Sequence, residues 1–345
     1  MARAMICRRL RCPRCWLLPA TLVAFTFAQA PGAEPGKPSL GLPLACTIQK
    51  TCWVANYIDV DSSRGARDFR CKSRTYDRHD GVDFAIRDRG VMTKGVPVLA
   101  SAAGVVKNVR DGMTDVAIGD ANSRSHIQGR ECGNGVVIDH AGGWQTQYCH
   151  LRQGSVRVKP GERVAAGASI GLVGLSGQTE FPHLHLAVRH NGGIVDPFTA
   201  RPMQAGCGKD AQPMWRNDLN LGYETVALYN AGFAAGTPDL DAIRNGDRTD
   251  GPFPVNAPAL VLWVDMLGVE VGDQLRFHLT DPPGQAILER EQQIEKTQAR
   301  RFVYVGKRRT SNAWAAGTYT GEVTHTRVVE GKATSKKIVT TIEIQ

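Results

Sequence analysis

Two histidine patterns in this sequence have the spacing of metal ligands. His79 precedes Asp83 by four residues, and Gly81 between them permits a turn that brings both side chains to one cation. His183 and His185 are separated by one residue, so their side chains share one face of a strand. Imidazole and carboxylate groups suit Zn²⁺, and two histidines with one aspartate would leave its fourth position open for water. That arrangement is typical of a catalytic zinc site.

A third pattern places His150 at the end of a predicted strand, in the run Tyr-Cys-His-Leu at 148–151. A single histidine in a strand is more often structural than catalytic. Beside the other two patterns, however, it leaves two histidines for proton transfer. The remaining histidines have no partners in the sequence, and we interpret them as surface or turn residues: His126, His140, His190, His278 and His325.

The three patterns, in this order, resemble the signature of the M23 zinc metallopeptidases of the lysostaphin and LytM type. The resemblance covers residues 79–198, including the run at 174–185 that ends in the histidine pair and the flanks at 97–106 and 188–197. It implies that His79, Asp83 and His185 bind one zinc ion. It also implies that His183 is catalytic, with His150 beside it.

One departure from the family pattern lies just before Pro182, where Glu180 and Phe181 replace the usual small residues. We expect this change to reshape the rim of the substrate groove.

The resemblance further implies a function. An exported zinc metalloendopeptidase would hydrolyse the peptide cross-links of bacterial peptidoglycan, with the peptide stems as its partner. Zinc would lower the pKa of its water to about 7, and His150 or His183 would carry the proton. Two alternatives remain: a catalytically inactive LytM-type regulator of other cell-wall hydrolases, and a cell-wall binding protein whose zinc is structural. The presence of all five chemical positions favours the enzyme.

The first 30 residues read as a secretory signal peptide. A basic stretch to Arg14 precedes an apolar run from Trp16 to Phe27 and small residues around Ala28 and Ala30. Later segments contain no run of ~20 apolar residues, so we expect no stable membrane insertion after cleavage. The expected location is periplasmic or secreted. Without residues 1–30 the net charge falls from +9 to +4, which does not indicate a nucleic-acid partner.

Six cysteines follow the predicted leader, and an even number in an exported chain favours disulfides. The absence of a C-x-x-C pair beyond residue 30 argues against zinc thiolates. Cys132 and Cys149 flank a predicted hairpin through 141–143 and are expected to pair. The order in which the other four pair is left open: Cys46, Cys52, Cys71 and Cys207.

The elements expected to position these residues are mainly β-strands. Short β-rich runs separated by turn residues predict an antiparallel sheet, with strands at 96–100, 104–109, 136–139, 145–149, 155–158, 170–173 and 183–188. Further strands at 259–264, 274–280, 302–305, 318–326 and 337–344 predict a C-terminal β-sandwich-like domain. One short helix is expected at 240–244.

We therefore expect a signal peptide (1–30), a linker with a cysteine-containing segment (31–78), an M23-like peptidase domain (79–207), a connecting segment (208–258) and an accessory β-domain (259–345). Every catalytic candidate precedes Pro197. The C-terminal domain is accordingly predicted to be dispensable for the chemistry. Nothing in the sequence indicates an oligomeric state.

Overall fold

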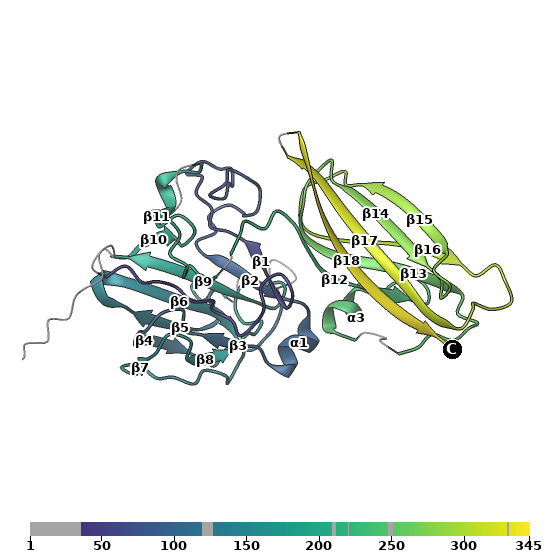
Figure 1. Ribbon diagram of the computed structural model, residues 1–345. Coiled ribbons are helices and arrows are strands. Elements are labelled where there is room, and N and C mark those ends of the chain that lie inside the picture. Colours follow the sequence, from purple (N-terminus) through teal and green to yellow (C-terminus); the bar gives the residue numbers. More distant parts are fainter. Residues whose placement is uncertain (1–35, 119–126, 209–211, 220, 248–250, 330) are drawn as a thin grey trace, which may run out of the picture. The chain divides into compact units, whose positions relative to one another are not determined.

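A computed structural model describes residues 36–118, 127–208, 212–219, 221–247, 251–329 and 331–345 (Figure 1). The predicted signal peptide and His126 lie outside the described residues. The described chain is mainly β, and its sheets are antiparallel, as expected. Within it, no helix is long and apolar enough to cross a membrane.

A nine-stranded sheet carries the candidate site. Its main path runs in the order β1-β2-β9-β6-β5-β4-β7, and β10 joins β9 to β11. The strands are β1 (Cys52–Asn56), β2 (Val82–Ile86), β4 (Gly104–Arg110), β5 (Asn134–Asp139), β6 (Trp144–Leu151), β7 (Arg163–Val164), β9 (His183–His190), β10 (Gly193–Asp196) and β11 (Arg201–Pro202). Strands β3 (Pro97–Leu99) and β8 (Ser169–Leu172) form a separate pair, and three short helical turns are α1 (Arg89–Lys94), η1 (Ala141–Gly143) and η2 (Met203–Ala205).

Along the central strands, successive side chains point to opposite faces of the sheet, so apolar residues and candidate site residues lie on different faces. In β9, Leu184 and Leu186 enter the hydrophobic core, as Val82 and Phe84 do in β2. His183, His185 and Asp83 occupy the intervening positions. Because β2 and β9 are antiparallel neighbours with Asp83 opposite His185, these positions meet on the face of the sheet that lies away from the core.

This region differs from the expectations in several strands, and the short strands β7, β10 and β11 were not predicted. Strands β1 and β2 were not predicted, because each is only five residues long and Asp83 interrupts the apolar run of β2. Strand β1 also extends the sheet to residues before 79. The predicted strand at 155–158 is wrong: the backbone N–H groups of Ser155 and Val156 donate to the carboxylate of Asp111, so these residues do not form a ladder.

The C-terminal part consists of two antiparallel sheets. One contains β12 (Ala227–Ala234), β13 (Ala259–Val269) and β16 (Gln298–Arg308), and the other contains β15 (Ala286–Gln293), β14 (Gln274–Thr280), β17 (Gly317–Val329) and β18 (Lys332–Ile344). Buried residues of both sheets, such as Leu262 and Phe277, form one core, so the arrangement is sandwich-like. The helix expected at 240–244 is confirmed as α3 (Leu240–Asn245). Strands β12 and β15 were not predicted.

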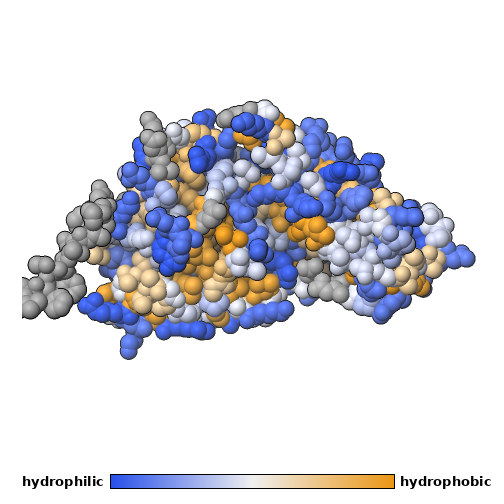
Figure 2. All heavy atoms as spheres, viewed as in Figure 1, coloured by the Kyte–Doolittle hydropathy of each residue, from blue (hydrophilic) through white to orange (hydrophobic). Residues whose placement is uncertain are grey.

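A small apolar cluster connects the two parts. Trp53 and Ala55 of β1 and Ala85 of β2 pack with Tyr229 of β12 and Leu267 of β13. The rings of Trp53 and Tyr229 are 5.8 Å apart, and β12 lies beside β1 (Figure 1). In the view of Figure 2, apolar residues gather over the N-terminal sheet and are interspersed with hydrophilic ones.

All six cysteines after the predicted leader form disulfides. The Cys132–Cys149 bond is confirmed. The order left open by the sequence is resolved as Cys46–Cys52 and Cys71–Cys207. The Cys71–Cys207 bond links the loop between β1 and β2 to the segment that follows η2.

The interpretation of His325 as a surface or turn residue is wrong. This side chain lies on β17, is 1% exposed, and places Nε2 2.8 Å from the carboxylate of Asp273. His325 lies on the same buried face of the strand as Tyr319 and Val323. Its partner Asp273 is distant in the sequence, so the sequence does not indicate this pairing.

Candidate metal centre and active site

The three predicted ligands lie together. Asp83 projects from β2, His185 from β9, and His79 from the loop before β2. His79 Nε2 is 3.1 Å from Asp83 Oδ1 and 3.2 Å from His185 Nδ1, while His185 Nδ1 is 2.9 Å from Asp83 Oδ1. The three residues are 2–8% exposed, so few waters can reach these atoms.

Hydrogen bonds at the far atoms fix which lone pairs enter the centre. His79 Nδ1 donates to the carbonyl of Tyr57 at 2.6 Å, so its Nε2 carries a lone pair. His185 Nε2 lies 3.2 Å from Asp80 Oδ1, which places its proton there and leaves Nδ1 free. Asn56 Nδ2 donates to Asp83 Oδ2 at 2.9 Å, leaving Oδ1 for the centre. Three electron-pair donors therefore converge.

This donor set fits a zinc ion. Three acceptor atoms about 3 Å apart in a buried site repel one another unless a cation or a proton lies between them. A tetrahedral Zn²⁺ with bonds of 2.0–2.1 Å separates its ligand atoms by roughly 3.3 Å. The separations of 2.9–3.2 Å are close to that value. Hydrogen bonds to the ligand atoms that do not face the metal also raise metal affinity.

The electrostatics of the centre favour positive charge. Burial disfavours a charged His185 ring, yet hydrogen bonds to Asp80 and Asp83 raise the pKa of His185 to about 9. Burial likewise disfavours an ionised Asp83, but the neighbouring His79 and His183 hold the pKa of its carboxyl well below the usual range. A proton can thus occupy the place of the cation, and protons compete with metal for His185.

Gly81 serves the centre in a different way from the turn that its presence suggested. A Cβ at this position would lie 2.4 Å from His185 Nε2 and 2.8 Å from the carbonyl oxygen of Leu186. The backbone of Gly81 is not in the left-handed region. Glycine is therefore required by the close approach of the His185 ring.

His150 and His183 lie beside the three predicted ligands. Their ring centroids are 4.7 Å apart. His150 Nδ1 donates to the carbonyl of Ser176 at 2.8 Å, and His183 Nδ1 to that of Phe181 at 2.9 Å. The neutral form of each ring would then carry its lone pair on Nε2, and His183 Nε2 lies 3.4 Å from Asp83 Oδ1.

The backbone of His150 is unusual. Its φ is +62°, a left-handed value that costs a non-glycine residue free energy. Its N–H donates to the carbonyl of Cys132 rather than continuing the ladder, and the register of β5 with β6 shifts nearby. Burial, followed by the charges of His183 and His185, lowers the pKa of His150 well below its usual value. His150 is accordingly neutral at neutral pH.

Sequence reasoning did not identify several supporting groups. Among these groups, only Asp80 could have been found from the sequence, because its carboxylate directly follows the predicted ligand His79. Asn56 belongs to an unpredicted strand. The carbonyls of Tyr57 and Ser176 act through the backbone, which carries no residue-type signal.

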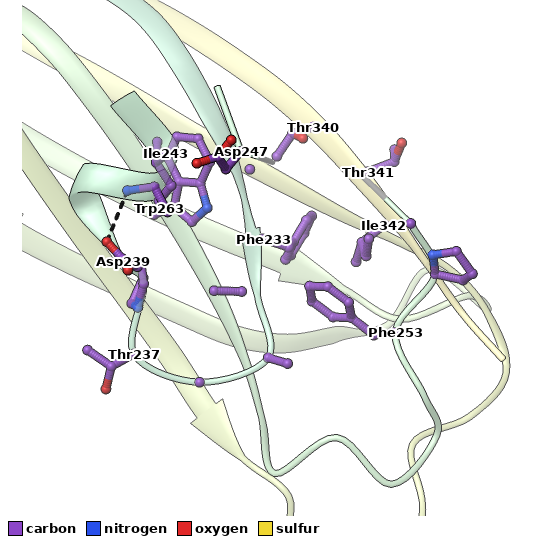
Figure 3. Close-up of a pocket in the computed structure, with 18 residues that line it drawn as sticks. Phe233, Thr237, Asp239, Ile243, Asp247, Phe253, Trp263, Thr340, Thr341 and Ile342 are labelled. Carbon is purple, nitrogen blue, oxygen red and sulfur yellow. Dashed lines mark hydrogen bonds between the residues drawn. The ribbon is translucent and has the colours of Figure 1, made fainter. Parts of the chain in front are cut away.

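Two cavities differ in their relation to this centre. One of about 400 Å³ lies over it and is lined by Tyr76, His79, His150 and His185 among others. Another, of about 790 Å³, lies in the C-terminal sandwich between Phe233, Phe253 and Trp263 (Figure 3). None of the five candidate residues lines the second cavity, whose Asp239 caps α3 through the N–H of Ala242.

Comparisons with known proteins match the part of the chain that holds this centre. Residues 77–197 match peptidase family M23, a range that includes all five candidate residues. Peptidoglycan DD-endopeptidase ShyA of Vibrio cholerae is 34% identical over 132 residues, which cover 38% of this chain and 25% of that protein. DD-carboxypeptidase/endopeptidase Mpg of Neisseria meningitidis is 35% identical over 132 residues, covering 36% and 23%. The match thus spans about a quarter of each relative.

Among solved structures, the catalytic domain of the antimicrobial peptidase lysostaphin from Staphylococcus simulans is 26% identical, covering 35% of this chain and 76% of that domain, with a TM-score of 0.26. Residues 77–197 of this chain are a domain of peptidase family M23.

Proposed function

We propose that this chain is an exported zinc metalloendopeptidase that hydrolyses peptide cross-links of bacterial peptidoglycan. The observation that carries the proposal is the convergence of three lone pairs, from His79, Asp83 and His185, beside two histidines with fixed tautomers. A bound zinc ion would supply a Lewis acid and a water of lowered pKa.

The two neighbouring histidines supply the proton transfers. His150 and His183 each anchor Nδ1–H on a backbone carbonyl and present Nε2 as a base. One can accept the proton of the attacking water and return it to the leaving amine. The other can donate a hydrogen bond to the developing oxyanion once it carries a proton.

The substrate and location rest on similarity and on the leader. Relatives of the peptidase domain are named as peptidoglycan endopeptidases, which supports peptide stems as the substrate. The basic and apolar pattern of residues 1–30 and the three disulfides support export to the periplasm or the medium.

The two alternatives make different demands on the centre. A regulator without activity needs no complete ligand set, and a structural zinc needs a fourth protein ligand. Among the described residues, His79, Asp83 and His185 form the one group of three or more such donors that could hold an ion. This three-ligand set favours the enzyme over both alternatives.

The test is to measure zinc per chain and cleavage of purified peptidoglycan by the same preparation. We expect about one zinc per chain, activity lost on chelation, and activity restored by added zinc. His278→Ala, which changes a histidine of β14, is the matched control and should leave both values unchanged. Stoichiometric zinc without cleavage would instead support a structural zinc, and cleavage that survives complete removal of metal would overturn the proposal.

A further inference from the structure

A third cavity, which we call the cleft, begins at the face of the sheet that carries the candidate metal centre and ends on the C-terminal domain. Its volume is about 640 Å³. Asn56, Ala85 and Phe181 line one side, and Tyr229 and Arg300 line the other. Asn56 donates to the ligand Asp83, and the ring of Phe181 lies 4.7 Å from that of His183. The cleft therefore adjoins the candidate active site directly.

The position of the C-terminal wall follows from strand alternation. Ala85 lies two residues after Asp83 on β2, and is paired with His183 on β9, so all three share one face. Tyr229 and Leu267 pack against Ala85 on that face. The C-terminal domain thus covers the sheet immediately beside the metal centre, where an extended peptide crossing the centre would continue.

Two arginines give this wall its charge. Arg300 donates through Nη2 to Asp265 at 2.8 Å, and Arg244 donates through Nε to the same oxygen at 3.1 Å. Asp265 is fully buried, so one carboxylate serves two guanidinium groups and one positive charge remains uncompensated. Within the described part of the chain, nothing accepts a hydrogen bond from Nη1 of either arginine.

The other charged groups that line the cleft, two arginines and three carboxylates, sum to one negative charge and offset this excess, so it is the unpaired Nη1 groups of Arg300 and Arg244 that favour an anion. Arg87 is paired with Asp88 at 2.8 Å, and Arg89 donates to Asn245. Two carboxylates remain, Asp241 in the first turn of α3 and the exposed Glu180 beside Phe181. Glu180 repels an anion at the end near the metal centre, which directs an anionic group toward the arginines.

We propose that Arg300 and Arg244 form a subsite that binds a carboxylate of the peptide substrate, and that the C-terminal domain is a wall of the substrate groove. This inference rests on the proposed peptidase function. The guanidinium of Arg300 lies 5.7 Å from the ring of Phe181, and hence at most about 10 Å from the ring of His183. That distance corresponds to about three residues of extended chain. The bound carboxylate therefore lies within about three residues of the scissile bond.

The experiment compares two forms of one soluble cross-linked peptide from peptidoglycan, with its carboxylates free or amidated. Cleavage by the full chain is measured as kcat/KM for each form, in wild type, Arg300→Gln and Arg244→Gln. Arg276→Gln is the matched control, because it removes one positive charge from an exposed pair with Glu289 outside the cleft. The ratio of the two kcat/KM values does not depend on the folded fraction of a variant.

We expect wild type and Arg276→Gln to prefer the free acid by about tenfold or more, the effect of a charge-assisted hydrogen bond. Arg300→Gln and Arg244→Gln should lose this preference, with the amidated peptide cleaved as by wild type. Equal cleavage of both forms by wild type, or an equal loss for both forms in Arg300→Gln, would overturn the subsite.

A binding measurement separates this result from the peptidase proposal itself. Fluorescence anisotropy of both labelled peptides with wild type and Arg300→Gln reports the subsite even if neither peptide is cleaved. Tighter binding of the free acid that disappears in Arg300→Gln supports the subsite, and equal binding of the two forms by wild type overturns it. An absence of cleavage, by contrast, contradicts only the proposed function.

Discussion

The Oδ1 atom of Asp83 lies within 3.4 Å of a nitrogen of each of three histidines, His79, His183 and His185. Two of these nitrogens belong to proposed ligands and the third to a proposed proton carrier. The distances alone do not separate the roles, so the assignment rests on the family resemblance and needs substitutions that distinguish metal binding from rate.

We predict that His185→Ala depletes zinc and consequently loses activity, because it removes one of three protein ligands. His150→Ala should keep the metal and still lose about 10²–10⁴-fold in rate, the usual value of general acid–base catalysis. His183→Ala should resemble His150→Ala. The measurements are zinc per chain and the fall in turbidity of a peptidoglycan suspension. Full zinc in His185→Ala together with zinc loss in His183→Ala would show that the two roles are exchanged.

We predict that Gly81→Ala weakens zinc binding by about 10–100-fold, the range found when the surroundings of a ligand are disturbed. The added Cβ would lie 2.4 Å from His185 Nε2 and would push the ring away from its hydrogen bond with Asp80. Competition with a chelator measures the affinity. Gly112→Ala is the control, since a Cβ there meets no atom within 4 Å. Equal affinities in the two variants would contradict this role of Gly81.

At the scale of elements, the Cys132–Cys149 bond holds the end of β6 near His150. Its loop spans 17 residues, for which the chain-entropy account gives about 3 kcal/mol. Cys132→Ser with Cys149→Ser should lower the free energy of unfolding by about that amount and also reduce activity, because the carbonyl of Cys132 accepts from the N–H of His150.

The control for this pair is Cys46→Ser with Cys52→Ser, whose 6-residue loop lies outside the site. It should lower stability without reducing the activity of the folded fraction. Urea unfolding and initial rates measure the two quantities. Undiminished activity in the Cys132 and Cys149 double variant would show that β6 positions His150 without the disulfide.

Asp196 at the end of β10 provides a prediction about pH. Its buried carboxylate accepts hydrogen bonds from Phe198 N–H and Thr199 Oγ1, but burial outweighs them and raises the pKa of Asp196 from 3.8 to about 6. The folded state therefore holds the proton more tightly than the unfolded state. The stabilisation is present below pH 4 and is lost as pH rises through about 6.

Asp196→Asn should remove this titration. We expect the variant to become more stable relative to wild type between pH 4 and pH 7, by up to about 3 kcal/mol. Urea unfolding at several pH values gives the difference. A constant difference across this range would mean that Asp196 does not titrate there.

At the scale of the whole molecule, the contact between the peptidase sheet and the C-terminal sandwich involves a buried cation. Arg74 is 2% exposed and donates to the carbonyl of Val54 in β1, while Gly268 of β13 lies against its guanidinium. A Cβ at Gly268 would lie 1.7 Å from Arg74 Nη1. Glycine at this one position lets the two parts pack together.

We predict that Gly268→Ala destabilises the chain by about 1–3 kcal/mol more than Gly272→Ala, the usual range for overpacking. Both glycines have positive φ, +73° and +93°, so backbone strain is common to the two variants. Only Gly268 meets a neighbour, because a Cβ at Gly272 has no atom within 4 Å. Denaturant midpoints measure the difference. Equal destabilisation would indicate that the Arg74 side chain moves aside without cost.

The sequence by itself determined the candidate site residues and many of the local elements. The period-2 alternation of β9 predicted that His183 and His185 share a face, and the cysteines around a turn predicted Cys132–Cys149; the structure confirms both. Such features depend on residues close in the chain, where strand geometry and turn residues fix direction and spacing.

Only the tertiary structure decided what surrounds the centre. Asn56, 27 residues before Asp83, reaches it through the pairing of β1 with β2, and Arg300 reaches Phe181 through the packing of a separate sheet. The sequence predicted an accessory C-terminal domain, because the pattern of each of its strands is that of an ordinary half-buried strand and indicates no contact with the peptidase sheet. Which faces of two such sheets meet depends on shape and register across the whole chain, and no local residue pattern records that contact.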